Sequence, residues 1–399
     1  MKKTLLLLTG TFYICFVNAQ PDHWTAKSSL TGFARMAGAG FSIGNKGYVG
    51  IGTDFSAVQS QLKDFWEYDP ATDSYSQIAD YPGGGVNGAG AFSIGDKGYV
   101  SCGAGNGNFY NDLWCYDTLS NSWSQKSSLP GQVRSYTLGF SVSGKGYIAT
   151  GYNGSIDLAD VWEYDPISDS WTQKLNITQA RSSAVGFSIG DKGYLATGYI
   201  GGGVLDCWEF DPIANTWTQK ADVSTQGRSD GCAFSIGEYG YICCGYVSAI
   251  IQNDLWEYDV VDNTWTQRSS LAGAERANPI SFTIGLKGYV FGGSDPGFNA
   301  LADMYEYTPD TVLINAVPIS NEPGDDWSFY PNPASDKVNI NTGNSGIKTA
   351  VLFNENGKEI MNVAFSGKKI ELDVSCLSPG IYFLVPGENK MKPGKVLIR

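Results

Sequence analysis

The sequence predicts an all-β protein built from six copies of one four-stranded unit, followed by a smaller β-domain. The first observation is a repeated pair of segments, which reads D-V-W-E-Y-D-P at 160–166 and S-W-T-Q-K at 170–174. The pair returns every 46 to 49 residues, and periods of this size are typical of propellers and solenoids. The second observation is composition: 50 Gly, 13% aromatic and only 17% charged residues favour short strands and tight turns over helices.

Each copy carries signals for four strands. In the fourth copy the β-rich runs 186–189 and 194–198 flank G-D-K-G, and Gly with Asn or Asp between such runs predicts a hairpin. A variable loop follows, then the W-E-Y-D strand, a turn with Pro and Asp or Asn, and the W-T-Q-K strand. A strand-four segment at 23–27 precedes the first full copy, whereas none follows the sixth copy at 303–307. We therefore expect a six-bladed β-propeller closed by the N-terminal strand, with no exposed sheet edge.

The predicted chain has four parts. Residues 1–19 have the basic end, apolar run and small-residue cleavage site of a secretory signal peptide. The propeller occupies 20–309, and no segment within it is apolar enough to span a bilayer. Pro, Gly and adjacent acidic residues make 310–327 a linker. Alternating apolar positions in 328–399 predict a small Ig-like β-sandwich.

Charge and cysteine content narrow the class of protein. The net charge is −13, and residues 20–327 carry 34 acidic but 16 basic side chains. This excess of acidic side chains argues against binding to nucleic acid or to anionic membrane surfaces. Seven cysteines follow the signal segment, an odd number at irregular spacing, so no disulfide framework is expected. Most lie in apolar strand patterns and are predicted to be small buried hydrophobic residues, although Cys102 with Cys115, or Cys232 with Cys243, could form a disulfide if they face each other.

The repeat resembles a known family. The copies in residues 20–310 have a glycine after strand two, then a Tyr and, seven residues later, a Trp. This spacing is similar to that of the kelch repeat. The double glycine of that family is present only at 292–293, and elsewhere a single Gly remains, as at 149–151 and 196–198. The resemblance implies a kelch-type propeller.

The tail resembles a second family. The segments Y-P-N-P-A-S-D-K-V-N-I at 330–340, G-I-Y-F-L at 380–384 and K-V-L-I-R at 395–399 are similar to the type A C-terminal sorting domain of the bacterial type IX secretion system. The resemblance implies export across the outer membrane by that machinery, removal of the tail and, often, attachment to lipopolysaccharide at the cell surface. The alternative is an ordinary terminal β-module. The motif residues are Tyr330, Pro331, Asn332, Pro333, Gly380 and Tyr382.

The loops between strands two and three are the candidate binding face. They vary between copies, whereas the opposite face repeats nearly unchanged, and variable loops on a rigid scaffold are usual binding sites. Their aromatic rings, carboxylates and amides suit sugars or peptides, although these side chains could instead pack locally. The candidate residues are Asp54, Phe55, Phe109, Tyr110, Tyr152, Asn153, Asp157, Tyr199, Tyr246, Asp295 and Phe298.

Five arginines and five glutamates recur at fixed places. Each arginine stands six residues before the strand-one Phe, each glutamate stands in a W-E-Y-D strand, and the second copy has Val86 and Cys115 instead. Because both are missing together, we hypothesise structural ion pairs, since a lone buried charge is costly. The alternative is that the arginines bind a ligand carboxylate. The hypothesised pairs are Arg35–Glu67, Arg134–Glu163, Arg181–Glu209, Arg228–Glu257 and Arg276–Glu306.

Catalytic motifs are mostly missing, so we favour a non-catalytic protein and leave enzymatic activity open. The single histidine, His23, makes a Ser-His-Asp triad improbable, and the paired histidines that copper oxidases of the kelch family need are absent. No metal or other cofactor is expected. The preferred function is a secreted or cell-surface propeller that binds a glycan or protein. The alternatives are an isomerase similar to the N-acetylneuraminate mutarotases of the kelch family, or a structural adhesion or matrix protein.

Overall fold

The computed structural model describes two units of an all-β chain. The described residues are 19–20, 22–54, 61–309 and 311–312, and in the tail 328–330, 337–341, 349–354, 359–364, 369–375, 377, 380–386 and 394–398. One unit spans residues 20–311, and the other joins 312–399 with 1–19. Within these described ranges no helix is long and apolar enough to cross a membrane.

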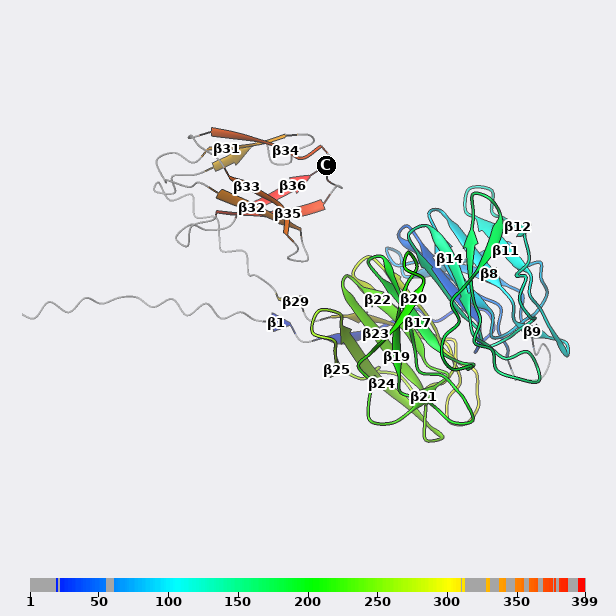
Figure 1. The fold of residues 1–399 in the computed structure, drawn as a ribbon. Helices are drawn as coiled ribbons and strands as arrows, with labels where there is room; N and C mark the ends of the chain where they lie inside the picture. The colour runs from blue at the N-terminus through cyan, green and yellow to red at the C-terminus, as the bar shows by residue number, and fades with distance from the viewer. Residues whose placement is uncertain are drawn as a thin grey trace, which may run out of the picture. The chain divides into compact units, whose positions relative to one another are not determined.

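Six antiparallel sheets, each with four main strands, make up the larger unit (Figure 1). We number them in chain order. The first is β3 (Ala39–Ile43), β4 (Lys46–Gly50), β5 (Phe65–Asp69) and β6 (Ser74–Ile78); the second β7 (Gly90–Ile94), β8 (Lys97–Ser101), β11 (Leu113–Asp117) and β12 (Ser122–Lys126); the third β13 (Leu138–Val142), β14 (Lys145–Ala149), β15 (Val161–Asp165) and β16 (Ser170–Lys174).

The remaining strands of this unit follow the same order. The fourth sheet is β17 (Val185–Ile189), β18 (Lys192–Ala196), β19 (Cys207–Asp211) and β20 (Thr216–Lys220); the fifth β22 (Cys232–Ile236), β23 (Tyr239–Val247), β24 (Ile250–Asp259) and β25 (Thr264–Arg268), with β21 (Arg228–Ser229) beside β23; the sixth β26 (Ile280–Ile284), β27 (Lys287–Phe291), β28 (Met304–Thr308) and β2 (His23–Lys27). The short strands are β1 (Ala19–Gln20), β9 (Ala104–Gly105), β10 (Asn108–Phe109) and β29 (Thr311–Val312).

The sixth sheet takes its outer strand from the N-terminus. Strand β2 pairs with β28, with Trp24 opposite Tyr307, as the missing strand-four segment of the last copy predicted. The indole Nε1 of Trp24 also donates to the carbonyl of Ser269, 2.8 Å away in the loop after the fifth sheet. The N-terminal segment is therefore held by the fifth and sixth sheets, the last two of the larger unit.

Neighbouring sheets pack through one repeated contact, a phenylalanine against a glycine. A Cβ at Gly98 in the second sheet would lie 2.1 Å from Phe41 of the first, so no side chain fits there. The same contact joins Gly47 of the first sheet to Phe282 of the sixth, where the distance would be 2.2 Å. It recurs at Gly146–Phe92, Gly193–Phe140, Gly240–Phe187 and Gly288–Phe234.

The first strands of the sheets lie next to one another. Strand β3 contacts β7 and β26, β13 contacts β7 and β17, and β22 contacts β17 and β26. Every first strand is thus flanked by the first strands of two other sheets, which is a propeller-like arrangement. The cores between the sheets are apolar and aromatic: Phe140, Tyr147 and Phe210 are each at most 5% exposed and share one cluster.

The smaller unit contains two sheets over one core. The first is β30 (Ser328–Tyr330), β31 (Lys337–Asn341) and β34 (Lys369–Asp373), and the second β33 (Glu359–Ala364), β32 (Thr349–Asn354), β35 (Gly380–Pro386) and β36 (Gly394–Ile398). Val338 and Leu372 of one sheet and Leu352 and Leu384 of the other form a common buried cluster. Of the predicted motif residues, Gly380 begins β35 and Tyr382 joins this core, whereas Pro331, Asn332 and Pro333 lie outside the described residues.

The six described cysteines are buried and free, in agreement with the prediction that they are small hydrophobic residues. Cys232 and Cys243 do lie opposite each other, on β22 and β23, but the structure holds them as thiols. Cys376 lies outside the described residues.

Candidate functional site on the loop face

The arginines bind aspartates, so the hypothesised arginine–glutamate pairs are wrong. Arg181 is fully buried, and its Nη1 and Nη2 donate to Oδ1 and Oδ2 of Asp206 at 2.6 and 2.8 Å. Trp208 Nε1 donates to the same carboxylate at 2.6 Å. This aspartate precedes the third strand and therefore lies at the sheet end that the arginine reaches. The other pairs are Arg35–Asp64, Arg134–Asp160, Arg228–Asp254 and Arg276–Asp303.

These ion pairs are structural. Burial alone would raise the pKa of Asp206, but the hydrogen bonds and charge of Arg181 hold that pKa below its usual range. Arg181 Nη1 also donates to the carbonyl of Thr197 at 2.9 Å, which ties the end of strand two to the loop. Because four of the five arginines are 0% exposed and Arg228 is 1% exposed, the guanidinium groups are not presented to a ligand in solution.

The glutamates have a different partner, the tyrosine of strand two. Glu163 lies opposite Tyr147 in the sheet, and its Oε2 accepts the tyrosine hydroxyl at 2.6 Å. The two residues that are missing from the second sheet therefore belong to two separate networks. The second sheet lacks both the arginine and the glutamate, and this joint absence wrongly suggested that the two bind each other. Val86 stands where the arginine partner of Asp112 would be, and Cys115 stands where the glutamate partner of Tyr99 would be.

A circle of backbone hydrogen bonds runs through the residues two positions after the five arginines and after Val86. All six have positive φ, between 50° and 64°: Ala37, Gly88, Tyr136, Ser183, Asp230 and Asn278. Each is bonded to the corresponding loop of the next sheet: Ala37 N to Asn278 O (2.9 Å), Gly88 N to Ala37 O (2.8 Å), Thr137 N to Gly88 O (3.3 Å), Ser183 N to Tyr136 O (3.0 Å), Asp230 N to Ser183 O (3.3 Å) and Asn278 N to Asp230 O (2.7 Å).

Four of these residues carry polar side chains, and we call Tyr136, Ser183, Asp230 and Asn278 the polar ring. All four are partly exposed. Burial raises the pKa of Tyr136, and the charge of Asp230 acts in the same direction. The polar ring was missed at the sequence level. The signal was present, because this position changes in every copy while the strand-one phenylalanine four residues later does not.

A pocket of about 360 Å³ lies beside the polar ring, between the fourth and fifth sheets. Its walls include Tyr199, Gly203, Ser229, Asp230 and Tyr246. The sequence predicted both tyrosines as ligand contacts, and the structure brings them together. The Asp230 carboxylate accepts a hydrogen bond from Ser229 Oγ at 2.8 Å, and burial together with this carboxylate raises the pKa of Tyr246.

A second aromatic pair joins the loops of the second and third sheets. The rings of Phe109 and Tyr152 are 6.1 Å apart at an interplanar angle of 73°, an edge-to-face contact. Tyr152 also pairs by backbone with Asp157 in the same loop. Tyr110 is partly exposed and bridges to the backbone of Arg134. These predicted residues are thus on the loop face but form a separate group from the Tyr199–Tyr246 pocket.

Three polar residues predicted as ligand contacts are either buried or form hydrogen bonds within their own loops. Asp54 is only 8% exposed. Asn153 Oδ1 accepts from the amides of Ser155 and Ile156, both at 2.9 Å. Asp295 accepts from the side-chain amide of Asn299 and from the backbone of its own turn, and these hydrogen bonds lower the pKa of Asp295. Phe298 is 63% exposed, and Phe55 lies outside the described residues.

The fifth sheet differs from the predicted loop. The variable loop expected between strands two and three is a hairpin here, because strands β23 and β24 continue through residues 246–253 and pair as far as Val247 and Ile250. The intervening Ser248 and Ala249 both have positive φ, 49° and 65°, which is the geometry of a tight two-residue hairpin turn. The extended hairpin carries Tyr246 and forms one wall of the pocket.

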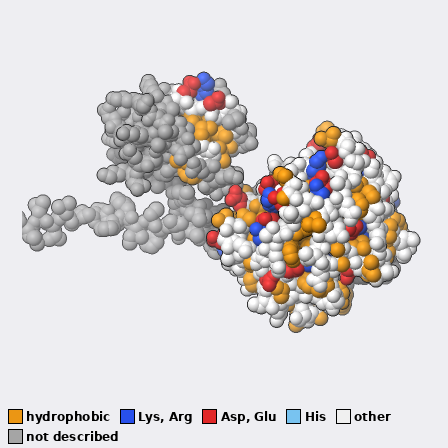
Figure 2. Space-filling model, viewed as in Figure 1, with side chains coloured by type: hydrophobic (Ala, Val, Ile, Leu, Met, Phe, Trp, Pro, Cys, Tyr) orange, Lys and Arg blue, Asp and Glu red, His pale blue; other side chains and the backbone are white. Residues whose placement is uncertain are grey.

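Charges give no further indication of a metal or nucleic-acid site. His23 lies in β2 opposite Thr308, and in the described part of the chain no group of three or more His, Cys, Asp or Glu side chains could hold a metal ion. On the face seen in Figure 2, basic and acidic side chains lie beside one another, without an extended basic area.

Comparison with known proteins identifies the tail. Residues 328–398 match the family model of the secretion system C-terminal sorting domain. The smaller unit is a type IX sorting domain. The sorting domain directs the protein to secretion or to the cell surface, and it implies an interaction with the type IX secretion machinery.

The larger unit matches solved structures but no curated protein. A structure named "Structure of YjhT" is similar with a TM-score of 0.61 and 20% identity, covering 69% of this chain and 95% of that chain. At this identity the likeness concerns the fold alone, and it supports a propeller-like arrangement ahead of the sorting domain. A search of curated proteins gave no match.

Proposed function

We propose that the larger unit is a six-bladed kelch-type β-propeller, closed by β2, that binds a glycan on its loop face. The six four-stranded sheets, the phenylalanine–glycine contact between the first and sixth sheets, and the circle of backbone hydrogen bonds support the closed arrangement. The kelch assignment rests on the repeated spacing of glycine, tyrosine and tryptophan.

The observation that carries the function is the Tyr199–Tyr246 pocket. Two aromatic side chains beside a carboxylate and a hydroxyl offer apolar faces for a sugar ring and acceptors for its hydroxyl groups. Tyr199 is 46% exposed and therefore accessible to a ligand. A volume of about 360 Å³ is near the lower end of ligand sites, which favours one or two sugar units.

An isomerase is the alternative that a specific observation favours. Tyr136 and Asp230 are both members of the polar ring, and a tyrosine and a carboxylate are a possible acid and base for opening a sugar ring. A protein ligand or a structural adhesion role would instead use the exposed apolar side chains of the same loops, such as Ile156, Ile250 and Phe298.

A glycan array probed with the full-length protein tests the proposal. We expect a saturable hit that Tyr199→Ala, Tyr246→Ala and Asp230→Asn each weaken at least tenfold. Tyr239→Ala is the matched control, because Tyr239 is a 41% exposed tyrosine of the same strand β23 at its other end. Binding that survives all three changes, or a silent array with folded protein, would reject this site. A hit then justifies measuring anomer exchange of that sugar, with Asp230→Asn as the test of catalysis.

We also propose the processing that the sequence implies. Residues 1–19 are a signal peptide, 20–309 the propeller, 310–327 a linker and 328–399 the sorting domain. Export is followed by removal of the tail and attachment to lipopolysaccharide. Mass spectrometry of the cell-surface form would show a C-terminus within or just before the sorting domain, together with a heterogeneous added mass; an intact tail on the surface protein would contradict the removal step.

A further inference from the structure

In five of the six sheets a tyrosine hydroxyl binds a buried or partly buried glutamate, and a lysine or arginine lies within ion-pairing distance of that glutamate. In the third sheet Tyr147, Glu163 and Thr172 lie opposite one another on three adjacent strands. Glu163 Oε2 accepts the Tyr147 hydroxyl at 2.6 Å and pairs with Lys174 Nζ at 2.9 Å. The same carboxylate position is occupied in the other four sheets by Glu67, Glu209, Glu257 and Glu306, each bonded to its tyrosine.

The second sheet keeps the surroundings of this carboxylate but not the carboxylate. Cys115 lies opposite Tyr99 and Ser124, in the register that Glu163 has in the third sheet. Burial raises the pKa of the Cys115 thiol, so it remains neutral and does not replace the negative charge. Tyr99 is 3% exposed, and its hydroxyl faces a sulfur in place of the carboxylate.

Lys126 is left without the acid that its counterparts bind. It occupies the register position of Lys174, as the pairings Leu113–Lys126 and Val161–Lys174 show. The described residues place no carboxylate within ion-pairing distance of Lys126; its charge does act on Asp169, but Ser127 N and the Tyr164 hydroxyl already bind that carboxylate, at 3.0 and 2.7 Å. Lys97, at the other side, is already paired with Asp117 at 2.6 Å. One lysine and one tyrosine hydroxyl therefore face a position from which a carboxylate is missing.

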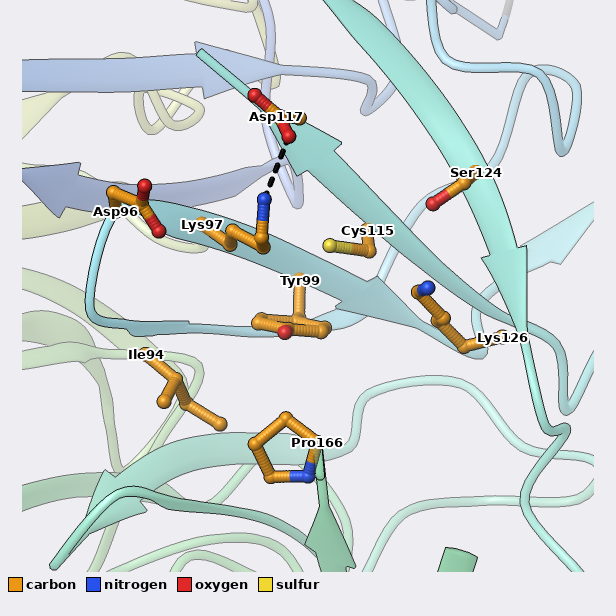
Figure 3. Close-up of a pocket in the computed structure, with 9 residues that line it drawn as sticks. All are labelled: Ile94, Asp96, Lys97, Tyr99, Cys115, Asp117, Ser124, Lys126 and Pro166. Carbon is orange, nitrogen blue, oxygen red and sulfur yellow. Dashed lines mark hydrogen bonds and ion pairs between the residues drawn. The ribbon is translucent and has the colours of Figure 1, made fainter. Parts of the chain in front are cut away.

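A pocket of about 340 Å³ lies at this position. In Figure 3 the side chains of Tyr99, Cys115 and Lys126 surround one space, with the Lys97–Asp117 ion pair on one side. Pro166, from the turn between β15 and β16 of the third sheet, closes the space opposite them. This volume lies within the range of small-molecule sites and is large enough for one monosaccharide.

We propose that this pocket binds the carboxylate of a small acid, such as an acidic monosaccharide. The ligand carboxylate takes the place of the absent glutamate, accepting from the Tyr99 hydroxyl and pairing with Lys126. Asp96 and Asp117 border the same pocket, so a ligand with one carboxylate is preferred over one with two. The pocket shares no residue with the Tyr199–Tyr246 pocket, and the proposal does not depend on the function proposed for the loop face.

Calorimetric titration of the full-length protein with acetate, glucuronate and glucose tests the proposal. We expect saturable binding of a carboxylate and none of neutral glucose. Tighter binding of glucuronate than of acetate would identify an acidic sugar, and equal binding would identify a free small acid. Lys126→Met should weaken binding at least tenfold, with an unchanged circular dichroism spectrum.

Cys115→Glu is the decisive variant, because it supplies the carboxylate from the chain itself. Five sheets already accommodate this residue, so the variant should fold, melt at a higher temperature than the wild type and lose carboxylate binding. Cys115→Ser is the matched control, since it removes the thiol but leaves the space and should retain binding. Binding by Cys115→Glu equal to that of the wild type, equal binding of glucose, or no heat with either acid would overturn the proposal.

Discussion

Asp112 keeps the place of the arginine-bound aspartates, although Val86 stands where its arginine would be. Trp114 Nε1 donates to Asp112 Oδ2 at 2.6 Å, as in the other sheets. Oδ1, however, is buried and accepts no hydrogen bond from the described residues. Burial raises the pKa of Asp112, whereas the pKa values of Asp64, Asp160 and Asp206 are lowered.

Asp112→Asn should therefore stabilise the protein at neutral pH, by about 1 kcal/mol, because an unpaired buried charge is replaced by a neutral group of the same shape. A raised folded-state pKa means that ionisation destabilises the fold. The gain should appear as the pH rises from the unfolded pKa through the folded pKa, and it should vanish at lower pH. Urea unfolding between pH 3 and 7 measures it. A loss of stability at pH 7 would show that the charge is paired in solution.

The arginine-bound aspartates should give the opposite pH dependence. Their lowered folded-state pKa values mean that they stabilise the fold above the unfolded pKa of about 3.9, and that this contribution is lost as the pH falls through the folded values. Asp206→Asn should be destabilised at pH 7 and should approach the wild type at low pH. A constant difference across the pH range would contradict the ionic contribution of Asp206.

Arg181→Met should lower the free energy of unfolding by about 3 kcal/mol, because it leaves the Asp206 carboxylate largely buried without its partner. It also removes the bond to the Thr197 carbonyl. Chemical denaturation measures the change, and the double variant Arg181→Met/Asp206→Asn should recover part of it. Lost ligand binding at an unchanged melting temperature would instead assign Arg181 to a binding role.

Thr197→Gly should stabilise the protein by about 1 kcal/mol. Thr197 is a β-branched residue at φ 58°, and its hydroxyl is buried without a hydrogen bond from the described residues. Gly292 occupies the same place in the sixth sheet at φ 62°. The relief of strain and of the unpaired hydroxyl exceeds the backbone entropy that glycine adds to the unfolded chain.

Thr197→Val is the matched control for that variant. It removes the hydroxyl but keeps the β-branched side chain at positive φ, so its melting temperature should lie between those of the wild type and Thr197→Gly. If Thr197→Gly melts below the wild type, the backbone at this position is not strained.

The strand order followed from the sequence because the repeat is internal. Each W-E-Y-D and W-T-Q-K pair predicted a hairpin, and β15 with β16 shows the expected pairing of Tyr164 with Trp171. The N-terminal strand was placed correctly because one strand-four segment stood in front and one was missing behind. The turn residues and the number of repeat copies were sufficient to predict the strand order of the larger unit.

The partners of the charged side chains did not follow from the sequence. Arg181 was assigned to Glu209, because the second copy lacks both the arginine and the glutamate but keeps the aspartate as Asp112, so presence and absence across copies favoured the wrong acid. Which acid binds the arginine depends on how far the guanidinium group reaches and on the direction in which side chains alternate along the strand. Both are seen only in the structure. The polar ring was missed for a related reason: its members share a backbone conformation with positive φ rather than a residue type.

The pairing of β2 with β28 joins the first described strand of the larger unit to its last full strand, and it makes the two chain ends interdependent. During synthesis nearly the whole unit is made before β28, the partner of β2, is available for pairing. The sixth sheet is therefore the last to be completed. A chain shortened past residue 27 lacks β2 and leaves the edge of β28 unpaired, where an intact chain can add its own β2.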